Sequence, residues 1–76
     1  GEGVAIKGFV DGSGAKAAGM EEGDRLVKVG EEPIRSYADI RIAMIGSRPG
    51  QKMPVDVLRT HLVGADERIA FEVELH

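Results

Sequence analysis

Apolar residues alternate with other residues along two segments near the carboxyl end of the chain. In residues 52–59 the apolar set is Met53, Val55 and Val57, and in residues 68–74 it is Ile69, Phe71 and Val73. A period of two places each set on one face of a β-strand. A short polar connection, residues 60–67, joins the two segments, so they are predicted to form a hairpin.

The amino-terminal half predicts shorter elements. Residues 3–10 form an apolar run with Val4 and Ile6 on one side, and Phe9 breaks the alternation directly after Gly8, where a bulge would restore it. Residues 15–18 lie between glycines and allow one helical turn. Residues 25–29 form a β-branched strand, and Ile34 is a strand stub that Pro33 confines to an edge or a strand start.

The longest helix is predicted from Tyr37 to about Ile45. Ser36 and Asp39 have the spacing of a capping box, and Gly46 marks the end of the helix. At 100° per residue the apolar side chains fall into two stripes. These stripes are Tyr37, Ile40 and Met44, and Ala38, Ile42 and Ile45, with Arg41 between them. The first stripe is expected to pack on the sheet, and the second either meets another packing partner or lines an open groove.

The predicted fold class is a small α+β domain. About five short strands form a mostly antiparallel sheet, accompanied by one helical turn and one real helix. With 76 residues the chain makes a single domain, residues 1–76. It begins at Gly1 rather than at Met, so we interpret it as a piece of a longer protein.

Composition narrows the function. Ten basic and thirteen acidic residues give a net charge of −3 with no basic block, which argues against nucleic acid and anionic lipid as main partners. The absence of cysteine excludes disulfides and thiolate metal sites. No apolar run approaches the ~18 residues that span a bilayer. Eleven glycines, about twice the average usage, separate the apolar runs.

Several patterns that carry chemistry elsewhere lack their context here. Residues 12–17 match G-x-G-x-x-A, but Gly19 and Gly23 end the following helix after one turn, so it could not hold a pyrophosphate. His61 and His76 have no helical partner or third ligand for a metal. Ser13, Ser36 and Ser47 are explained as turn and cap residues, and Glu21 and Glu22 as solvated surface. We therefore expect no cofactor, no metal and no catalysis.

The order of the motifs resembles that of a PDZ domain. The matching segments are Gly3–Ile6, Asp11–Met20 and Gly23–Gly30, which are similar to the family pattern of strand, "GSPAAxAGL" and "GDxIlxvnG". Residues 35–50 are similar to bacterial PDZ modules, such as those of high-temperature-requirement serine proteases, site-2 metalloproteases, carboxy-terminal processing proteases and some exopeptidases. The resemblance covers nearly the whole chain and implies a small, partly open antiparallel barrel or sandwich.

The chain departs from the family pattern in three places. Gly14 stands where "GSPAA" has proline, and Glu31 stands where the "nG" turn has Asn or Asp. The family's Φ-Gly-Φ carboxylate loop and the peptide-pairing strand after it precede the strand that begins here at Gly3. We therefore expect this piece to lack them, and we expect the edge of the segment 3–10 to pair with another chain.

The resemblance implies a peptide groove beside the helix. By β-augmentation a polypeptide C-terminus adds a strand to the sheet, and the helix wall of the groove would be Ala38, Arg41, Ile42 and Ile45. The function it implies is a non-catalytic peptide-binding module on a bacterial protease, in the cell envelope or periplasm, with the catalytic domain of the parent chain as a second partner. The alternative is a structural spacer or regulatory gate that packs on its parent and binds no free peptide.

Overall fold

The computed structural model describes residues 3–8 and 14–75. Their elements follow the order β1 (Val4–Ala5), α1 (Gly14–Ala18), β2 (Arg25–Val29), β3 (Glu32–Pro33), α2 (Tyr37–Ala43), β4 (Lys52–Arg59) and β5 (Glu67–Glu74). The strands form one antiparallel sheet in the order β1-β2-β4-β5, and β3 pairs with β2 outside that path. The predicted α+β class, with five short strands and two helices, is confirmed.

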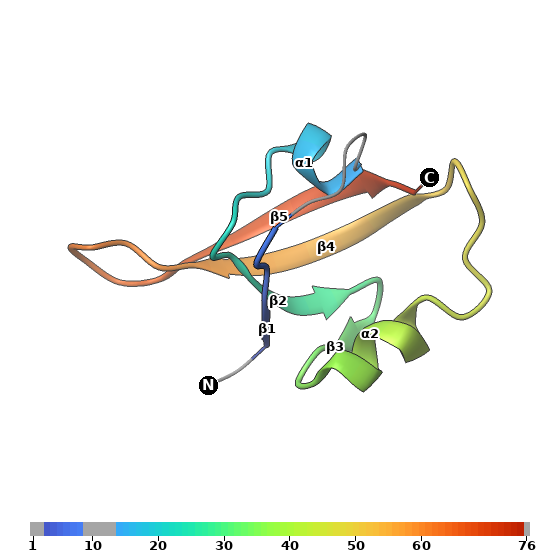
Figure 1. The fold of residues 1–76 in the computed structure, drawn as a ribbon, viewed down its shortest axis with the longest axis horizontal. Helices are drawn as coiled ribbons and strands as arrows, with labels where there is room; N and C mark the ends of the chain where they lie inside the picture. The colour runs from blue at the N-terminus through green and yellow to red at the C-terminus, as the bar shows by residue number, and fades with distance from the viewer. Residues whose placement is uncertain (1–2, 9–13, 76) are drawn as a thin grey trace.

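The β4–β5 hairpin is the longest feature of the molecule (Figure 1). Its strands pair residue by residue from Lys52 opposite Glu74 to Arg59 opposite Glu67. Met53, Val55, Val57 and Val73 are buried, and Ile69 and Phe71 pack partly buried against them. The period of two in the sequence therefore identified both the hairpin and its inner face.

Two strands of the amino-terminal half differ from their predicted extents. Strand β1 covers only Val4–Ala5, because Ile6 already bonds to the turn before β2 rather than to a strand. Phe9 and residues 10–13 lie outside the described residues, so the bulge at Gly8 stays a prediction. Strand β3 ends at Pro33, one residue before the predicted stub, and Ile34 follows it as a buried core residue.

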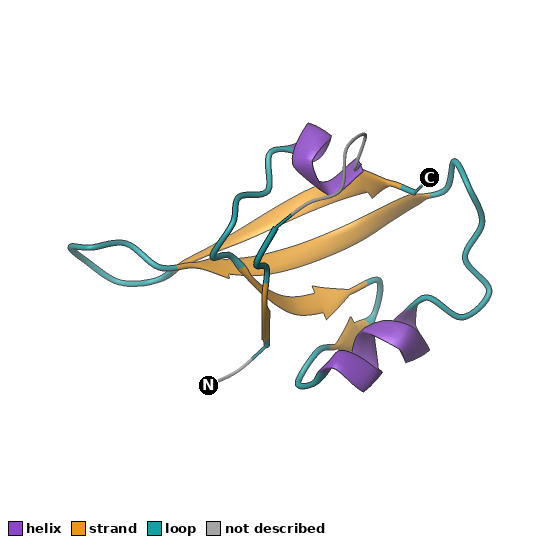
Figure 2. Cartoon of the chain, viewed as in Figure 1, coloured by secondary structure: helices purple, strands orange, loops and turns teal. Residues whose placement is uncertain are grey.

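The two helices lie at different parts of the sheet (Figure 2). Helix α1 lies beside the carboxyl end of β5, and α2 lies beside β3. Ser36 precedes α2 in an extended conformation, and the Asp39 carboxylate accepts hydrogen bonds from the main-chain N–H groups of Arg35 and Ser36 at 2.8 and 3.1 Å. The helix ends at Ala43, two residues before the predicted end.

The predicted core stripe of α2 is correct for two of its three residues. Ile40 and Met44 pack against the buried core, but the side chain of Tyr37 is 71% exposed. Ile40, Ala43 and Met44 are the residues of this segment that pack against the core. Tyr37 lies only about 20° from Met44 around the helix axis, so its exposure follows from its place in the first turn of the helix, outside the contact, rather than from its angle.

Candidate functional site

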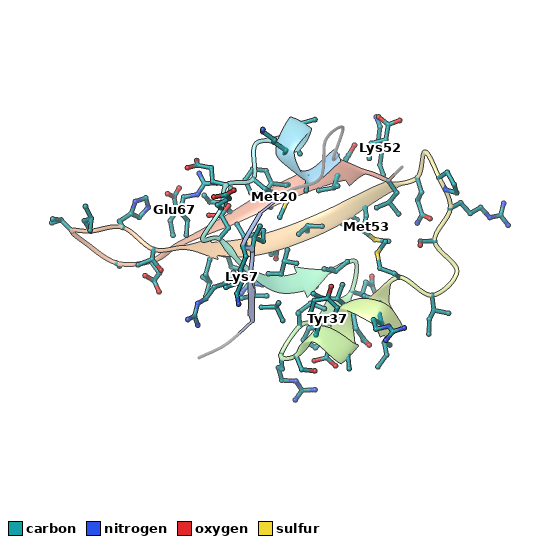
Figure 3. The ribbon with its side chains drawn as sticks, viewed as in Figure 1. Lys7, Met20, Tyr37, Lys52, Met53 and Glu67 are labelled. Atoms are coloured by element: carbon teal, nitrogen blue, oxygen red, sulfur yellow. The ribbon has the colours of Figure 1, made fainter. Side chains whose placement is uncertain are left out.

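An open apolar groove runs between β1 and α2. Residues 4–8 form one wall, Leu26 of β2 contributes to its floor, and Tyr37 and Ile40 of α2 form the opposite wall. Its volume is about 620 Å³. Lys7 and Tyr37 are labelled on these two walls in Figure 3. The groove therefore combines a strand, a helix and an apolar lining in one open site.

The outer edge of β1 presents main-chain groups to this groove. Ile6 directs both of its groups toward the β2 side, since its N–H donates to the Asp24 carbonyl and its carbonyl accepts from the Gly23 N–H, each at 2.8 Å. Successive residues of an antiparallel strand present these groups to opposite sides. The N–H and C=O groups of Ala5 and Lys7 therefore point away from β2, and within the described residues no strand pairs with them.

Asp24 connects the residue after β1 to the end of β4. Its main-chain carbonyl bonds Ile6, and its buried carboxylate accepts hydrogen bonds from Nε and Nη2 of Arg59 at 2.9 and 2.8 Å. The carboxylate also accepts from the Glu21 N–H at 3.0 Å. Arg59 ends β4, so Asp24 joins the β1 wall of the groove, through its main-chain carbonyl, to the β4–β5 hairpin, through its carboxylate.

The charges of this network stabilise one another. The hydrogen bond from Arg59 is the main cause that lowers the pKa of Asp24, and burial opposes it. The same hydrogen bond raises the pKa of Arg59. Arg59 also bonds Glu21 at 2.9 Å and lies 5.9 Å from the centre of the Phe71 ring. Asp24 and Arg59 therefore both stay charged near neutral pH, and their ion pair has a structural role.

The helix residues expected to line the groove are exposed. Ala38, Arg41 and Ile42 lie on the outer side of α2, and Ile45 follows the helix with 79% of its surface exposed. The groove between β1 and α2 is lined on its helix side by Tyr37 and Ile40, and the predicted wall residues stay a prediction. Tyr37 and Arg41 are four residues apart within α2, so they lie on the same side in successive turns, and Ile45 follows beyond the end of the helix.

The sequence did not identify the strand residues that line the groove or the Asp24–Arg59 ion pair beside it. Ile6 and Leu26 line the groove, although the sequence placed Ile6 only on one side of a predicted strand and assigned no side to Leu26. The pairing of Asp24 with Arg59 spans 35 positions, which no local pattern reveals. The available signal was an acidic residue directly before one strand and an arginine at the end of another.

The described residues hold no group of three or more potential metal ligands. His61 forms an exposed pair with Glu67 at 3.0 Å, Ser47 donates to the Met44 carbonyl, and Ser36 precedes α2. Ser13 and His76 lie outside the described residues. No helix within the described part of the chain is long and apolar enough to cross a membrane.

Comparison with known proteins identifies the family of this chain. The family model for the PDZ domain matches residues 6–59. The periplasmic pH-dependent serine endoprotease DegQ of Escherichia coli (strain K12) is 30% identical over 57 residues, which are 75% of this chain and 12% of that protein. The chain thus spans about an eighth of the length of this relative. The arrangement of strands and helices and the match over residues 6–59 agree, and the chain therefore belongs to the PDZ domain family, whose members are non-catalytic modules.

Proposed function

We propose that this domain binds an extended polypeptide segment, which adds as a strand to the outer edge of β1 and covers the groove between β1 and α2. The observation that carries the proposal is the position of the outward N–H and C=O groups of Ala5 and Lys7 along an apolar groove. A strand edge supplies main-chain hydrogen bonds, and pockets beside it select side chains. Peptide binding is also the general role of the family.

The proposed parent is a bacterial protease. The similarity to a periplasmic serine endoprotease supports a protease-associated module and a periplasmic location. In such a protein the domain would recognise or position a polypeptide, preferably its C-terminus, for a catalytic domain elsewhere in the chain. The module would contribute binding and no chemistry.

The exposed side of α2 would form the outer wall of the proposed binding site. A ligand segment that lies over Tyr37 would next meet Arg41 and Ile45, and its outer side chains would reach Ala38 and Ile42. Ala38, Arg41, Ile42 and Ile45 form the proposed outer wall of the site. Arg41 at the rim would influence the association rate and the preference for acidic ligands more than the fold.

Peptide titration followed by amide NMR tests the proposal. Hydrophobic C-terminal peptides should shift the amide signals of Ala5 and Lys7 in a saturable way. The amide signals of Leu62 and Val63, which lie at the far end of the β4–β5 hairpin and are fully exposed, should stay unchanged and serve as the internal control.

Backbone methylation of the peptide identifies the binding mode. When single amides of the best peptide are methylated in turn, affinity should fall at every second residue, because alternate residues of an added strand bond to β1. If no peptide gives saturable shifts, the binding function is wrong. The spacer or gate alternative, in which the domain packs on its parent without a free ligand, would then be favoured.

A further inference from the structure

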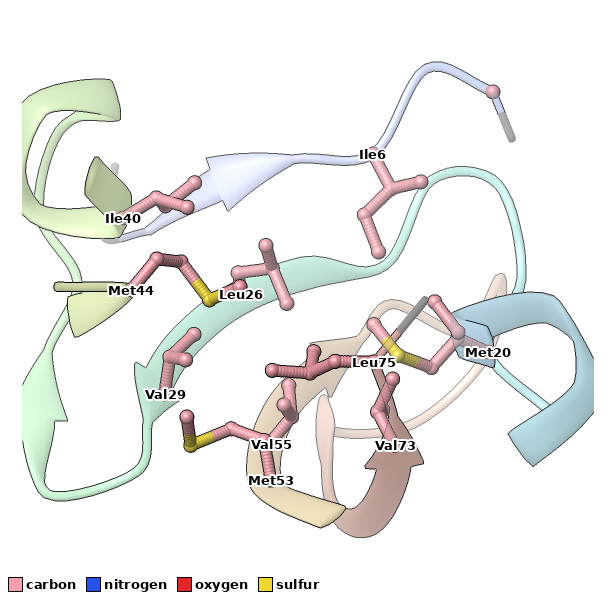
Figure 4. A pocket seen from close by; sticks show the side chains of 12 residues that line it. Ile6, Met20, Leu26, Val29, Ile40, Met44, Met53, Val55, Val73 and Leu75 are labelled. Carbon is pink, nitrogen blue, oxygen red and sulfur yellow. The ribbon is translucent and has the colours of Figure 1, made fainter. Parts of the chain in front are cut away.

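The sheet has an apolar side and a charged side. On the apolar side, Val29 of β2 and Val55 of β4 point into a cavity that all three methionines also line (Figure 4). Side chains of a strand alternate between its two faces, so Lys28 and Asp56, which are next to these valines, lie on the opposite side. We call this opposite side the outer face of the sheet.

A second hollow lies on the outer face, with a volume of about 480 Å³. Its lining combines three apolar residues with three cations, namely Val27, Pro33, Ile34, Lys28, Arg35 and Arg68. The cations come from β2, from the segment between β3 and α2, and from β5, so no local pattern in the sequence groups them. Among the described residues, none lines both this hollow and the groove between β1 and α2. We call it the cationic hollow.

Two of the three cations have no ion-pair partner within the described residues. Asp56 lies directly opposite Lys28 in the pairing of β2 with β4, but its carboxylate accepts hydrogen bonds from Nε and Nη2 of Arg68 at 3.3 and 3.0 Å. The side chains of Lys28 and Arg35 form no hydrogen bond or ion pair with any described residue. The Asp39 carboxylate bonds the main-chain N–H of Arg35 rather than its guanidinium.

The charge of the hollow is opposite to that of the whole chain. The chain has a net charge of −3, whereas three cations and the Asp56 carboxylate meet at the hollow. A cleft lined by one sign of charge focuses its field and attracts counter-ions. Lys28 is half-buried, so its charge has lost part of its hydration without gaining a partner. An anionic group between Lys28 and Arg35 would supply the counter-charge.

The size and lining of the hollow favour one class of anion. Nucleic acids and anionic membranes present phosphates over long surfaces, and the acidic remainder of this chain would repel them. Inorganic phosphate is small enough for the hollow, but it gains nothing from the apolar part of the lining. A glutamate side chain combines a carboxylate with an aliphatic stem, which can lie against Val27 and Pro33. An acidic polypeptide therefore uses both parts of the lining.

We propose that the cationic hollow is a second binding site, which takes an acidic segment of a partner protein. One carboxylate of that segment lies between Lys28 and Arg35, while Arg68 stays paired with Asp56. The site does not depend on the proposed function, because its residues and those of the groove are separate sets. The domain can therefore hold an acidic segment on its outer face whether the groove is empty or filled.

Peptide titration followed by amide NMR of the unaltered chain tests the site. The probe is a short peptide of glutamate and alanine with both ends blocked, which has no large apolar residue for the groove. It should shift the amide signals of Val27, Lys28 and Arg35 in a saturable way and leave those of Ala5 and Lys7 unchanged. The same peptide with glutamine in place of glutamate should give no shifts. The affinity of the glutamate peptide should fall between about 50 and about 200 mM salt, because salt screens exposed ion pairs.

Two arginine substitutions form a matched pair. Arg35→Met and Arg48→Met each remove one positive charge, but Arg48 lies between α2 and β4 and does not line the hollow. Arg35→Met should weaken binding of the glutamate peptide by about fivefold, the upper range for one exposed ion pair, and Arg48→Met by less than about twofold. The double variant Lys28→Met, Arg35→Met should show no saturable binding. Thermal unfolding establishes that the variants are folded, and the peptide pair on the unaltered chain remains decisive for any variant that is not.

Four other outcomes would each overturn the inference. The glutamate peptide gives no saturable shifts, or Arg35→Met and Arg48→Met weaken it equally, which would indicate diffuse attraction instead of a site. Inorganic phosphate gives the same shifts at the same concentration, which would make the hollow an unselective anion site. A short DNA duplex or phosphatidylglycerol vesicles shift these amides while the peptide does not. The groove proposal is tested separately with hydrophobic peptides, so either proposal can fail while the other holds.

Discussion

Asp24 joins three parts of the chain through one residue. Its carbonyl bonds β1, its carboxylate bonds Arg59 at the end of β4, and the same carboxylate accepts the N–H of Glu21 in the preceding turn. It is 1% exposed, which places a full negative charge inside a very small domain. Such a charge is tolerated only while its partners remain.

Substitution of Arg59 should show how strongly the stability of the fold depends on the partners of the buried Asp24 carboxylate. Arg59→Met leaves the buried Asp24 carboxylate without its cation, and an uncompensated buried charge costs about 3–5 kcal/mol. Because the pKa of Asp24 is lowered in the native state, the unfolded chain binds more protons once the pH falls below about 4. The native chain begins to lose this stabilisation there and loses it fully as the pH falls through the native pKa of Asp24.

Urea denaturation of the unaltered chain and of Arg59→Met, at pH 7 and at pH 3, measures both effects. The difference between their unfolding free energies should be large at pH 7 and smaller at pH 3. An equal difference at both values would assign the role of Arg59 to its packing on Phe71 instead.

Gly14 explains one departure from the family pattern. A Cβ atom at this position would coincide with the main-chain carbonyl of Glu74 in β5. Helix α1 thus begins so close to the last strand that only glycine fits, where the family pattern has proline. The close approach also places α1 beside the carboxyl end of β5, the edge strand opposite β1.

We expect Gly14→Ala to displace α1 from β5 and to destabilise the domain by about 1–3 kcal/mol, the usual cost of overpacking. Gly8→Ala is the control, because a Cβ there meets only the flexible end of Glu22 at 3.7 Å. Thermal unfolding of the two variants provides the measurement, and an unchanged midpoint for Gly14→Ala would mean that α1 begins elsewhere.

At the scale of elements, α2 has two apolar sides with different roles. Ile40 and Met44 pack against the core, while Ile42 is 53% exposed and Ile45 is 79% exposed. The sequence predicted this division because helix geometry alone separates the two stripes. It did not predict the exposure of Tyr37, which depends on how much of the helix reaches the sheet.

Alanine substitutions should separate the two sides. Ile40→Ala removes a side chain packed against the core and should cost about 2 kcal/mol or more, whereas Ile42→Ala should change stability by less than about 0.5 kcal/mol. Denaturant unfolding measures both. Equal losses would make both sides part of the core and remove Ile42 from the proposed outer wall.

The strands show what local pattern can and cannot determine. Residues 25–29 and 52–59 were predicted with the bounds that β2 and β4 have, since alternation and β-branched residues are local signals. Pro54 is unusual because β4 lies between two other strands. Strand β2 ends at Val29, and Pro54 faces the following turn, where its carbonyl accepts the Gly30 N–H at 2.8 Å. Only the pairing register reveals why proline is tolerated there.

At the scale of the whole molecule, an apolar cavity of about 250 Å³ is enclosed by elements that lie far apart in the sequence. Helix α1 supplies Ala15 and the residues after it supply Met20, while Ile40 comes from α2 and Val55 from the hairpin. Each of these residues was identifiable as apolar, and several as core. That they surround an open space instead of filling it follows from the positions of α1 and α2 at different parts of the sheet, which no pattern in the sequence encodes.

The gathering of all methionines around this one cavity has a chemical consequence. Oxidants convert the methionine thioether into a polar sulfoxide, and the chain has no cysteine that would react first. Met44 is only partly buried and would be reached before Met20 and Met53, which are 5% and 8% exposed. Each sulfoxide would place a strong hydrogen-bond acceptor in a wall that otherwise offers none. Oxidation of these methionines would therefore make the wall of the cavity less favourable to apolar groups and more favourable to water, and at Met53 it would also disturb the buried face of β4.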